Sequence, residues 1–187
     1  MNMARSFLTG ENIYLQPMDN SFFDPKYLEW VNDDEIIDNM VTLNFPATEE
    51  ALRNYILENT SKENIAFFAI RWKENNEFIG TVKLGPIDWI HRKAFYGRLI
   101  GDKNYRGKGV GTEVAKLILS YAFNRLNLHW IGATMGVENI MSIKSNEKAG
   151  LKKIAVIPNQ LWFKGKYVDN IIMGITSEEY FKSKSSS

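Results

Sequence analysis

Residues 106–111 read Arg-Gly-Lys-Gly-Val-Gly and lie between an expected strand that ends near Ile100 and an expected amphipathic helix over 110–126. Glycines let backbone N–H groups approach an anion closely, and the N-terminus of the following helix adds about half a positive charge. The segment therefore predicts a site for a phosphate or pyrophosphate group. A strand-to-helix turn can also need glycine for its backbone angles alone, so both interpretations stand at this point.

The spacing of these glycines excludes two nucleotide-binding classes. No Lys-Ser or Lys-Thr pair follows the last glycine, as a P-loop NTPase requires, and the glycines do not follow G-x-G-x-x-G. The surrounding strands also follow one another as a meander rather than as parallel strands joined by helices.

The periodicity of apolar residues outward from this loop predicts one α/β domain over residues 1–187, with its core at about 11–175 and a C-terminal tail at 176–187. The tail is rich in Lys and Ser and is expected to be frayed from 183 on. We expect a mixed, mostly antiparallel central sheet of about seven strands flanked by about four helices. The expected strands are 12–17, 65–72, 78–87, 94–100, 130–137, 152–157 and 167–175, and the helices begin at Pro25, Thr48, Val110 and Asn139.

Charge and composition exclude several function classes. The net charge is +1, which disfavours non-specific nucleic-acid binding, and the absence of cysteine removes thiol nucleophiles and thiolate metal sites. No apolar run approaches the roughly 20 residues of a membrane span, and no secretory signal is present, so we expect a cytoplasmic protein without a membrane partner. His91 and His129 do not form a metal-ligand pattern, so we expect no metal.

The small net charge conceals a segregation of the charged residues. Residues 19–63 hold eleven acidic and three basic side chains, whereas residues 91–125 hold eight basic and two acidic ones. A charge run usually marks only a solvated face. The basic segment nevertheless surrounds the glycine-rich loop, where an anionic ligand would bind.

A second motif, Asn-Ile-Met-Ser at 139–142 followed by Asn-Glu-Lys-Ala-Gly-Leu at 146–151, accompanies the loop. Together they resemble the GNAT superfamily of acetyl-CoA-dependent N-acetyltransferases, in the branch that includes ribosomal-protein N-terminal and amino-sugar acetyltransferases. The resemblance spans about 11–175 and implies acetyl-CoA as co-substrate and a strand before the loop that splays from its neighbour. It implies these cofactor-binding residues: Leu99, Ile100, Gly101, Arg106, Gly107, Lys108, Gly109, Val110, Gly111, Thr112, Asn139 and Asn146.

Acetyl transfer from a thioester to an amine needs a deprotonated amine, a stabilised oxyanion and a protonated leaving thiolate, but no acyl-enzyme. Many family members carry a tyrosine acid at the position of Asn146, whose amide donates a hydrogen bond but gives up no proton. Relatives carry a glutamate base at the positions of Phe95 or Thr134, neither of which is a carboxylate. Candidates for catalysis are Asn146, Tyr96, Thr134 and Glu138, with His91 as a further candidate through a water relay. Glu138, Tyr96 and His91 each have an ordinary structural interpretation as well.

The acceptor is expected near the two early helices and the hairpin over 159–167, with His91, Trp162 and Tyr167 as candidate contacts. The acidic helices suit a cationic peptide or a polyamine. Lys164, Lys166 and Arg92 suit a nucleotide-linked amino sugar, which we favour on resemblance to amino-sugar acetyltransferases. Alternatives are a protein N-terminus, an antibiotic, or a non-catalytic acyl-CoA-binding regulatory module. A nucleic acid is disfavoured as a partner, and a homodimer is a further expectation.

Overall fold

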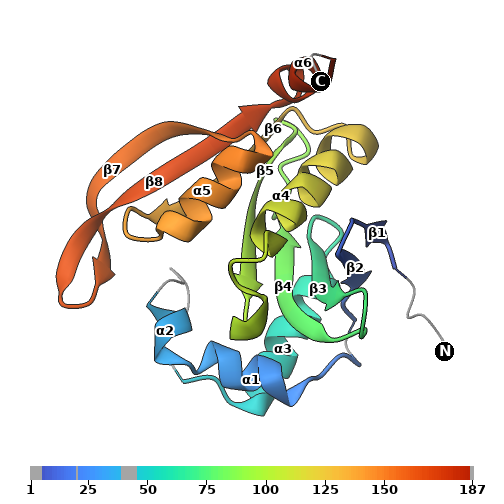
Figure 1. Cartoon of the computed structure of the whole chain (residues 1–187), viewed down its shortest axis with the longest axis vertical. Helices are drawn as coiled ribbons and strands as arrows, with labels where there is room; N and C mark the ends of the chain where they lie inside the picture. The colour runs from blue at the N-terminus through green and yellow to red at the C-terminus, as the bar shows by residue number, and fades with distance from the viewer. Residues whose placement is uncertain (1–5, 20, 39–45, 186–187) are drawn as a thin grey trace.

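The computed structural model describes residues 6–19, 21–38 and 46–185, in which eight strands form one sheet in the order β1-β2-β3-β4-β5-β6-β8-β7 (Figure 1). The strands are β1 (Leu8–Thr9), β2 (Ile13–Pro17), β3 (Ala66–Trp72), β4 (Phe78–Leu84), β5 (Lys93–Ile100), β6 (Trp130–Gly136), β7 (Lys152–Phe163) and β8 (Lys166–Thr176). The helices are α1 (Pro25–Val31), α2 (Asp34–Ile37), α3 (Glu49–Thr60), α4 (Val110–Ser120), α5 (Ile140–Ala149) and α6 (Ser177–Ser185), with a 3₁₀ turn at Lys103–Tyr105 and a π-helical turn at Tyr121–Arg125.

The sheet carries helices on both faces, and two apolar cores result. The larger core lies between the sheet and α4, whose Val114, Ile118 and Leu119 are buried. The second core packs α1 and α3 against the opposite face, through Trp30 and Ile56 among others. Asp24 caps α1 ahead of Pro25, and Thr48 caps α3, as the sequence predicts.

The central strands β5 and β6 splay apart, which confirms the expectation from the family resemblance. The antiparallel meander β3-β4-β5 is also confirmed. β5 pairs with β6 in parallel only from Lys93 to Phe95 on one strand and from Trp130 to Gly132 on the other, within the described residues. Beyond these pairs β5 continues beside β4 and β6 beside β8, so a gap opens between them.

The mixed, mostly antiparallel sheet flanked by helices is confirmed, and the structure extends the expected elements in three details. The described residues hold eight strands and six α-helices, because the two-residue β1, the four-residue α2 and the C-terminal α6 are too short or too polar for a periodic signal. The tail over 177–185 is a helix because Tyr180 is buried against Phe123, with ring centroids 5.0 Å apart. β7 continues to Phe163 because it pairs with β8 past a bulge between Ile157 and Leu161.

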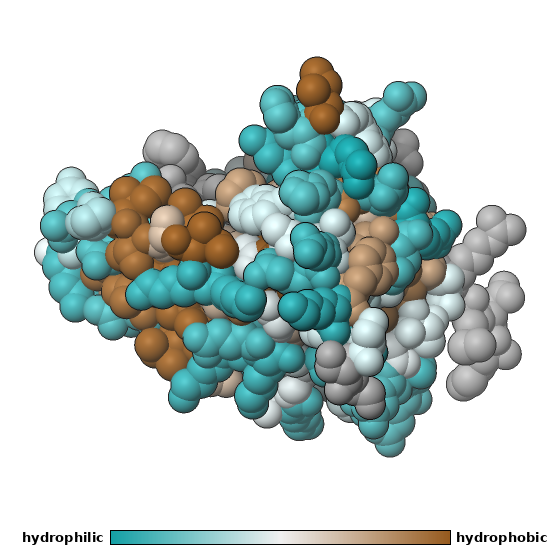
Figure 2. Space-filling model, turned by 90° about the horizontal axis from the view of Figure 1, so that it is seen from above, coloured by the Kyte–Doolittle hydropathy of each residue, from teal (hydrophilic) through white to brown (hydrophobic). Residues whose placement is uncertain are grey.

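β7 is an edge strand with an apolar exposed surface. Seen from above, hydrophobic side chains gather on the side of the molecule where β7 and β8 lie (Figure 2). Ile154 and Val156 of β7 are among the exposed apolar residues. No helix of the described residues has the length and apolar character needed to cross a membrane.

Candidate active site

A cavity of about 580 Å³ lies where the end of β5, the loop after it, α2, the N-terminal end of α4 and one side of α5 meet. A volume of this size is typical of small-molecule sites. Its walls combine apolar and charged groups, and they come from segments far apart in the sequence. The lining residues are Glu35, Ile36, Arg98, Leu99, Ile100, Tyr105, Arg106, Gly107, Gly109, Val110, Gly111, Thr112, Glu138, Asn139, Ile140, Met141, Ser142, Lys144, Ser145 and Lys148.

The glycine-rich loop forms one wall of this cavity and fits an anionic group. Gly107 and Gly109 have φ of 76° and 83°, in the left-handed region that favours glycine. A Cβ on either residue would meet no atom within 4 Å. Glycine is therefore favoured at these positions by the backbone angles rather than by crowding, and the space beside the backbone is open. Gly109 caps α4 without a side-chain hydrogen bond, so the first N–H groups of α4 are available to a pyrophosphate.

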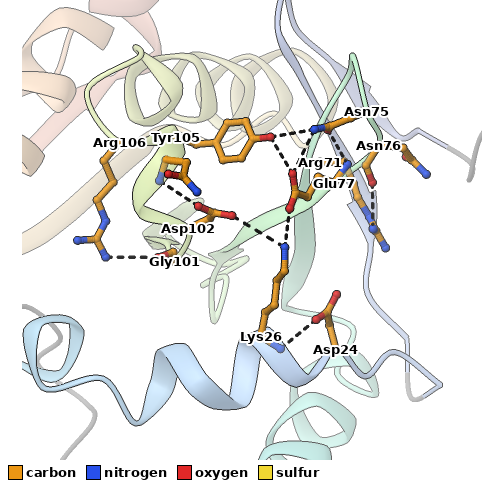
Figure 3. Close-up of polar contacts among 11 residues, drawn as sticks. Asp24, Lys26, Arg71, Asn75, Asn76, Glu77, Gly101, Asp102, Tyr105 and Arg106 are labelled. Carbon is orange, nitrogen blue, oxygen red and sulfur yellow. Dashed lines mark hydrogen bonds and ion pairs between the residues drawn. The ribbon is translucent and has the colours of Figure 1, made fainter.

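A polar network joins the segment before the loop to α1 and to the β3-β4 hairpin, and it holds the loop in place (Figure 3). The Tyr105 hydroxyl donates to Glu77 Oε2 at 2.9 Å, and Lys26 Nζ lies 2.5 Å from Glu77 Oε1 and 4.0 Å from Asp102 Oδ2. The hydrogen bond from Lys26, followed by that from Tyr105, lowers the pKa of the Glu77 carboxyl. Asp102 accepts from the Asn104 N–H at 2.9 Å, which fixes the turn into the loop.

α2 brings carboxylates onto the cations of the loop. Arg106 Nη1 lies 2.6 Å from Glu35 Oε1, and its Nε donates to the Ile100 carbonyl at 3.2 Å. Lys103 Nζ lies 2.9 Å from Glu35 Oε2 and 3.2 Å from Asp33 Oδ2. The hydrogen bonds from Lys103 are the main reason that the pKa of both carboxyls is lowered. Arg106, the arginine of the loop motif, therefore bonds the backbone at the end of β5 and holds α2 against the loop.

Two candidate catalytic residues come together between β5 and α5. The Tyr96 hydroxyl donates to Asn146 Oδ1, and Arg98 Nη1 donates to both groups, at 2.8 Å and 2.9 Å. Asn146 is 1% exposed. Burial raises the pKa of the Tyr96 phenol, and the nearby Arg98 charge opposes that shift. The Arg98 Nη2 group also hydrogen-bonds the Ser145 hydroxyl on α5.

The other candidates for catalysis and acceptor binding lie apart from this pair. Glu138 lines the cavity, and its carboxylate accepts from Lys166 Nζ at 2.9 Å. Thr134 is exposed on β6, whose neighbouring residues 133 and 135 belong to the core on the α4 side. His91 lies in the turn before β5, with Nδ1 2.7 Å from Asp88 Oδ2.

Trp162 and Tyr167 form an exposed ring pair in the β7-β8 hairpin and do not line the cavity. Their ring centroids are 5.0 Å apart, and the two side chains are 64% and 63% exposed. Among the described residues, no three His, Asp or Glu side chains converge in a way that could hold a metal ion.

Residues 12–152 match the family model described as an acetyltransferase (GNAT) domain. The chain belongs to the GNAT acetyltransferase family. It is 31% identical over 182 residues, 95% of this chain and 97% of the relative, to the SPbeta prophage-derived uncharacterized N-acetyltransferase YokL of Bacillus subtilis strain 168. It is also 31% identical over 106 residues, 57% of this chain and 56% of the relative, to spermidine N(1)-acetyltransferase of Escherichia coli K12.

Solved structures share the fold of this GNAT protein. The spermidine N-acetyltransferase from Vibrio cholerae in complex with CoA and spermine superposes with a TM-score of 0.80 at 23% identity, covering 91% of this chain and 98% of that one. The family and the fold make the protein an acetyl-CoA-dependent N-acetyltransferase. The relatives do not assign it to the ribosomal-protein and amino-sugar branch, since spermidine acetyltransferases are among them.

The residues expected to bind acetyl-CoA in this GNAT enzyme line the cavity, apart from Gly101, Lys108 and Asn146. Gly101 packs instead against α1, because a Cβ there would lie 1.9 Å from Trp30 Cδ2. The Lys108 ammonium lies 5.3 Å from the Tyr105 ring centroid. Asn146 is covered and reaches the cavity through its contact with Arg98.

Sequence reasoning missed the contributions of α2, Arg98 and the inner face of α5. Arg98 interrupts an otherwise apolar strand, and that interruption is a signal that could have found it. On α5, residues 142, 145 and 148 recur at helical spacing, which predicts one shared face. Nothing in the sequence places Glu35 against a loop about 70 residues away, because that contact depends on the packing of α2.

Proposed function

We propose that this enzyme acetylates a primary amine of a small polycationic acceptor of the polyamine class. The observation that carries the proposal is the acidic helix α2 at the cavity. Glu35 lines the cavity, and Asp34 is exposed beside it and forms no ion pair with any residue that the structure describes. Carboxylates at a site entrance attract and orient an acceptor that carries several positive charges.

Two further observations support a polycationic acceptor. Residues 19–63, which include α1, α2 and α3, hold eleven acidic and three basic side chains. Relatives of this chain include enzymes named spermidine N(1)-acetyltransferase. The names of these relatives support a polyamine and lend no support to the amino sugar that the sequence favoured.

The cavity fits acetyl-CoA, which supplies an acyl group activated as a thioester. The N–H groups over residues 107–112 would hold its pyrophosphate, and the free edge of β5 at Leu99 and Ile100 would hydrogen-bond its pantetheine arm. Asn139 caps α5 beside this path through its bond from the Ser142 N–H at 3.1 Å. These residues position the acyl group without forming a covalent bond to it.

In the transfer, a bond forms between the acceptor nitrogen and the acyl carbon while the bond from that carbon to sulfur breaks. The acceptor nitrogen loses one proton, and the sulfur gains one. We assign Glu138, a carboxylate that lines the cavity, to accept the amine proton through a water molecule. We assign Asn146 and Tyr96 to hydrogen bonding at the sulfur end.

A nucleotide-linked amino sugar is the second candidate acceptor. The exposed Trp162 and Tyr167 rings favour it, because aromatic faces stack on sugars and bases, and Lys164 and Lys166 flank the turn between them. We also propose a homodimer, formed across the exposed apolar edge strand β7.

The experiment is a panel of amines with acetyl-CoA, read by release of free CoA. The panel holds spermidine, UDP-4-amino sugars, aminoglycosides and peptides with free N-termini. We expect the highest kcat/KM with spermidine. Asp34→Asn should raise the KM for spermidine several-fold and leave the KM for acetyl-CoA unchanged, whereas Glu63→Gln, outside the cavity, should change neither.

Each other outcome of the panel counts against the proposal in a defined way. Preference for the UDP-amino sugar would replace it with the second candidate. Binding of acetyl-CoA without CoA release for any amine would favour a non-catalytic acyl-CoA-binding module.

A further inference from the structure

The Lys166 side chain holds a primary amine against a carboxylate of the cavity wall. Its Nζ donates to Glu138 Oε1 at 2.9 Å, and Glu138 lines the cavity. Lys166 begins β8, directly after Gly165 in the turn that joins β7 to β8. An amine of the chain itself is therefore held at the carboxylate that we assign to accept the proton of the acceptor.

The backbone brings these two side chains together. β6 pairs with β8 to the end of the strand, and the Val137 N–H then donates to the Asp169 carbonyl at 3.0 Å. Glu138 follows Val137 in the sequence, and Lys166 lies three residues before Asp169. The strand register therefore keeps the start of β8 beside Glu138.

Glu138 and the glycine-rich loop lie beyond the ends of two strands that diverge. The loop follows β5 and Glu138 follows β6, and within the described chain these strands pair with each other only over their first three residues. Both the loop and Glu138 line the cavity. A CoA with its phosphates on the loop and its arm along β5 would therefore reach into the gap whose other strand leads to Glu138.

We propose that Lys166 is a self-acetylation site, modified within one chain by the acetyl-CoA bound in the cavity of that chain. This inference rests on the acetyl transfer and the Glu138 assignment of the proposed function, but not on the identity of the free acceptor. The Lys166 ammonium first gives one proton to Glu138, which passes it to solvent. The nitrogen then bonds to the acyl carbon, and the bond from that carbon to sulfur breaks with its electron pair going to sulfur. The nitrogen loses its second proton, the sulfur gains one, and the products are acetyl-lysine and CoA.

Attachment to the chain favours this amine over amines in solution. A group tethered by a short flexible segment has an effective concentration of about 1 mM or more at a neighbouring site. The Lys166 side chain is 61% exposed, so rotation about the bonds of its four-carbon stem can carry Nζ from Glu138 into the cavity. The transfer needs no second protein molecule, so its rate constant should not depend on protein concentration.

Two other lysines form the same kind of ion pair away from the cavity. Lys164, in the same turn, has its Nζ 3.4 Å from Asp38 Oδ2. Lys152 has its Nζ 2.7 Å from Glu179 Oε1. Neither of these carboxylates lines the cavity, and the two lysine side chains are 60% and 66% exposed. They therefore report the direct chemical acetylation of an exposed, paired lysine by acetyl-CoA.

The test is peptide mapping by mass spectrometry after the full chain is incubated with isotope-labelled acetyl-CoA. We expect Lys166 to be labelled at least about tenfold faster than Lys164 and Lys152, with one rate constant at all protein concentrations. Equal labelling of these three lysines, or a rate constant that rises with protein concentration, would overturn the proposal. Labelling confined to Lys144 or Lys148, which line the cavity on α5, would overturn it as well.

Two variants separate catalysed from chemical acetylation. Glu138→Gln cannot accept a proton, so we expect it to slow the labelling of Lys166 by about tenfold and to leave Lys152 unchanged. Loss of the ion pair frees the amine, so direct chemical acetylation would stay the same or rise in this variant. Gly109→Glu, which we expect to weaken CoA binding, should also slow Lys166 alone. An unchanged rate at Lys166 in a folded Glu138→Gln variant would contradict the proposal.

The result is distinguishable from that of the amine panel. Rapid labelling of Lys166 without turnover of any free amine would support self-acetylation and exclude the proposed acceptor class. Turnover of spermidine with Lys166 labelled no faster than Lys152 would support that acceptor class and overturn self-acetylation.

Discussion

Glu35 Oε1 on α2 lies 2.6 Å from Arg106 Nη1, so a short helix from the N-terminal third of the chain is paired with the glycine-rich loop. The pair holds α2 at the cavity wall that both residues line. It also places a carboxylate where the phosphates of acetyl-CoA would approach. The pair therefore joins α2, where we propose that the acceptor binds, to the loop that we propose holds the phosphates.

Glu35→Gln should tighten CoA binding, because the variant removes a negative charge that competes with the pyrophosphate for Arg106 and Lys103. Exposed ion pairs are weak because solvent and salt screen them, so we expect a Kd lower by about two- to fivefold at low salt, with a smaller effect at high salt. Isothermal titration with CoA measures it. Glu49→Gln, which removes the Arg53 pair on α3, is the control. Weaker CoA binding in Glu35→Gln would show that the pair organises the loop instead.

Gly109→Glu should reduce CoA affinity by more than about tenfold, since a carboxylate would stand in the open space beside the first N–H groups of α4. Gly165→Glu is a matched control, because Gly165 has φ of 84° and also meets no atom within 4 Å. It lies in the β7-β8 turn, so the backbone strain and the charge are the same at a different place. Equal CoA affinity in the two folded variants would show that the loop is not part of the CoA-binding site.

Gly101→Ala should destabilise the protein by about 1 to 3 kcal/mol, because the new methyl group would overlap the Trp30 ring of α1. Gly97→Ala, on the same strand, meets no atom within 4 Å and should change the free energy of unfolding by less than about 0.5 kcal/mol. Urea unfolding of both variants measures the difference. Equal stabilities would mean that α1 shifts freely over the sheet.

Glu179 should contribute stability that depends on pH. The hydrogen bond from Lys152, at 2.7 Å, and those from Thr176 lower the pKa of the Glu179 carboxyl to about 2. A depressed folded-state pKa means that the contribution is complete above the ordinary value of 4.5 and is lost as the pH falls toward 2. The Glu179 side chain is 39% exposed, so solvent screening limits the effect to about 1 kcal/mol.

The measurement for Glu179 is the difference in unfolding free energy between the wild type and Glu179→Gln as a function of pH. That difference should be constant near neutral pH and shrink below pH 5. Glu178→Gln, in the same turn of α6, is the control. A difference that does not change with pH would contradict the assigned interaction.

The elements that carry strong periodicity were predictable from sequence. The apolar spacing of 110–122 predicts α4, and Asp24 and Thr48 mark helix starts that the structure confirms. α2 and α6 were not predictable, because their stability comes from contacts rather than from a pattern. In α6 the burial of one side chain, Tyr180, outweighs the polar composition of the tail.

The sequence by itself determined the glycine loop, the α5 motif and the family, because these depend on backbone angles and residue types that are local in the chain. Only the tertiary structure decided what surrounds them. The splay of β5 from β6 opens the gap, and the packing of α5 over that gap brings Arg98 to Asn146, 48 residues later in the chain. Local patterns report backbone preference, whereas the position of a charge relative to a distant amide is fixed by how the layers pack.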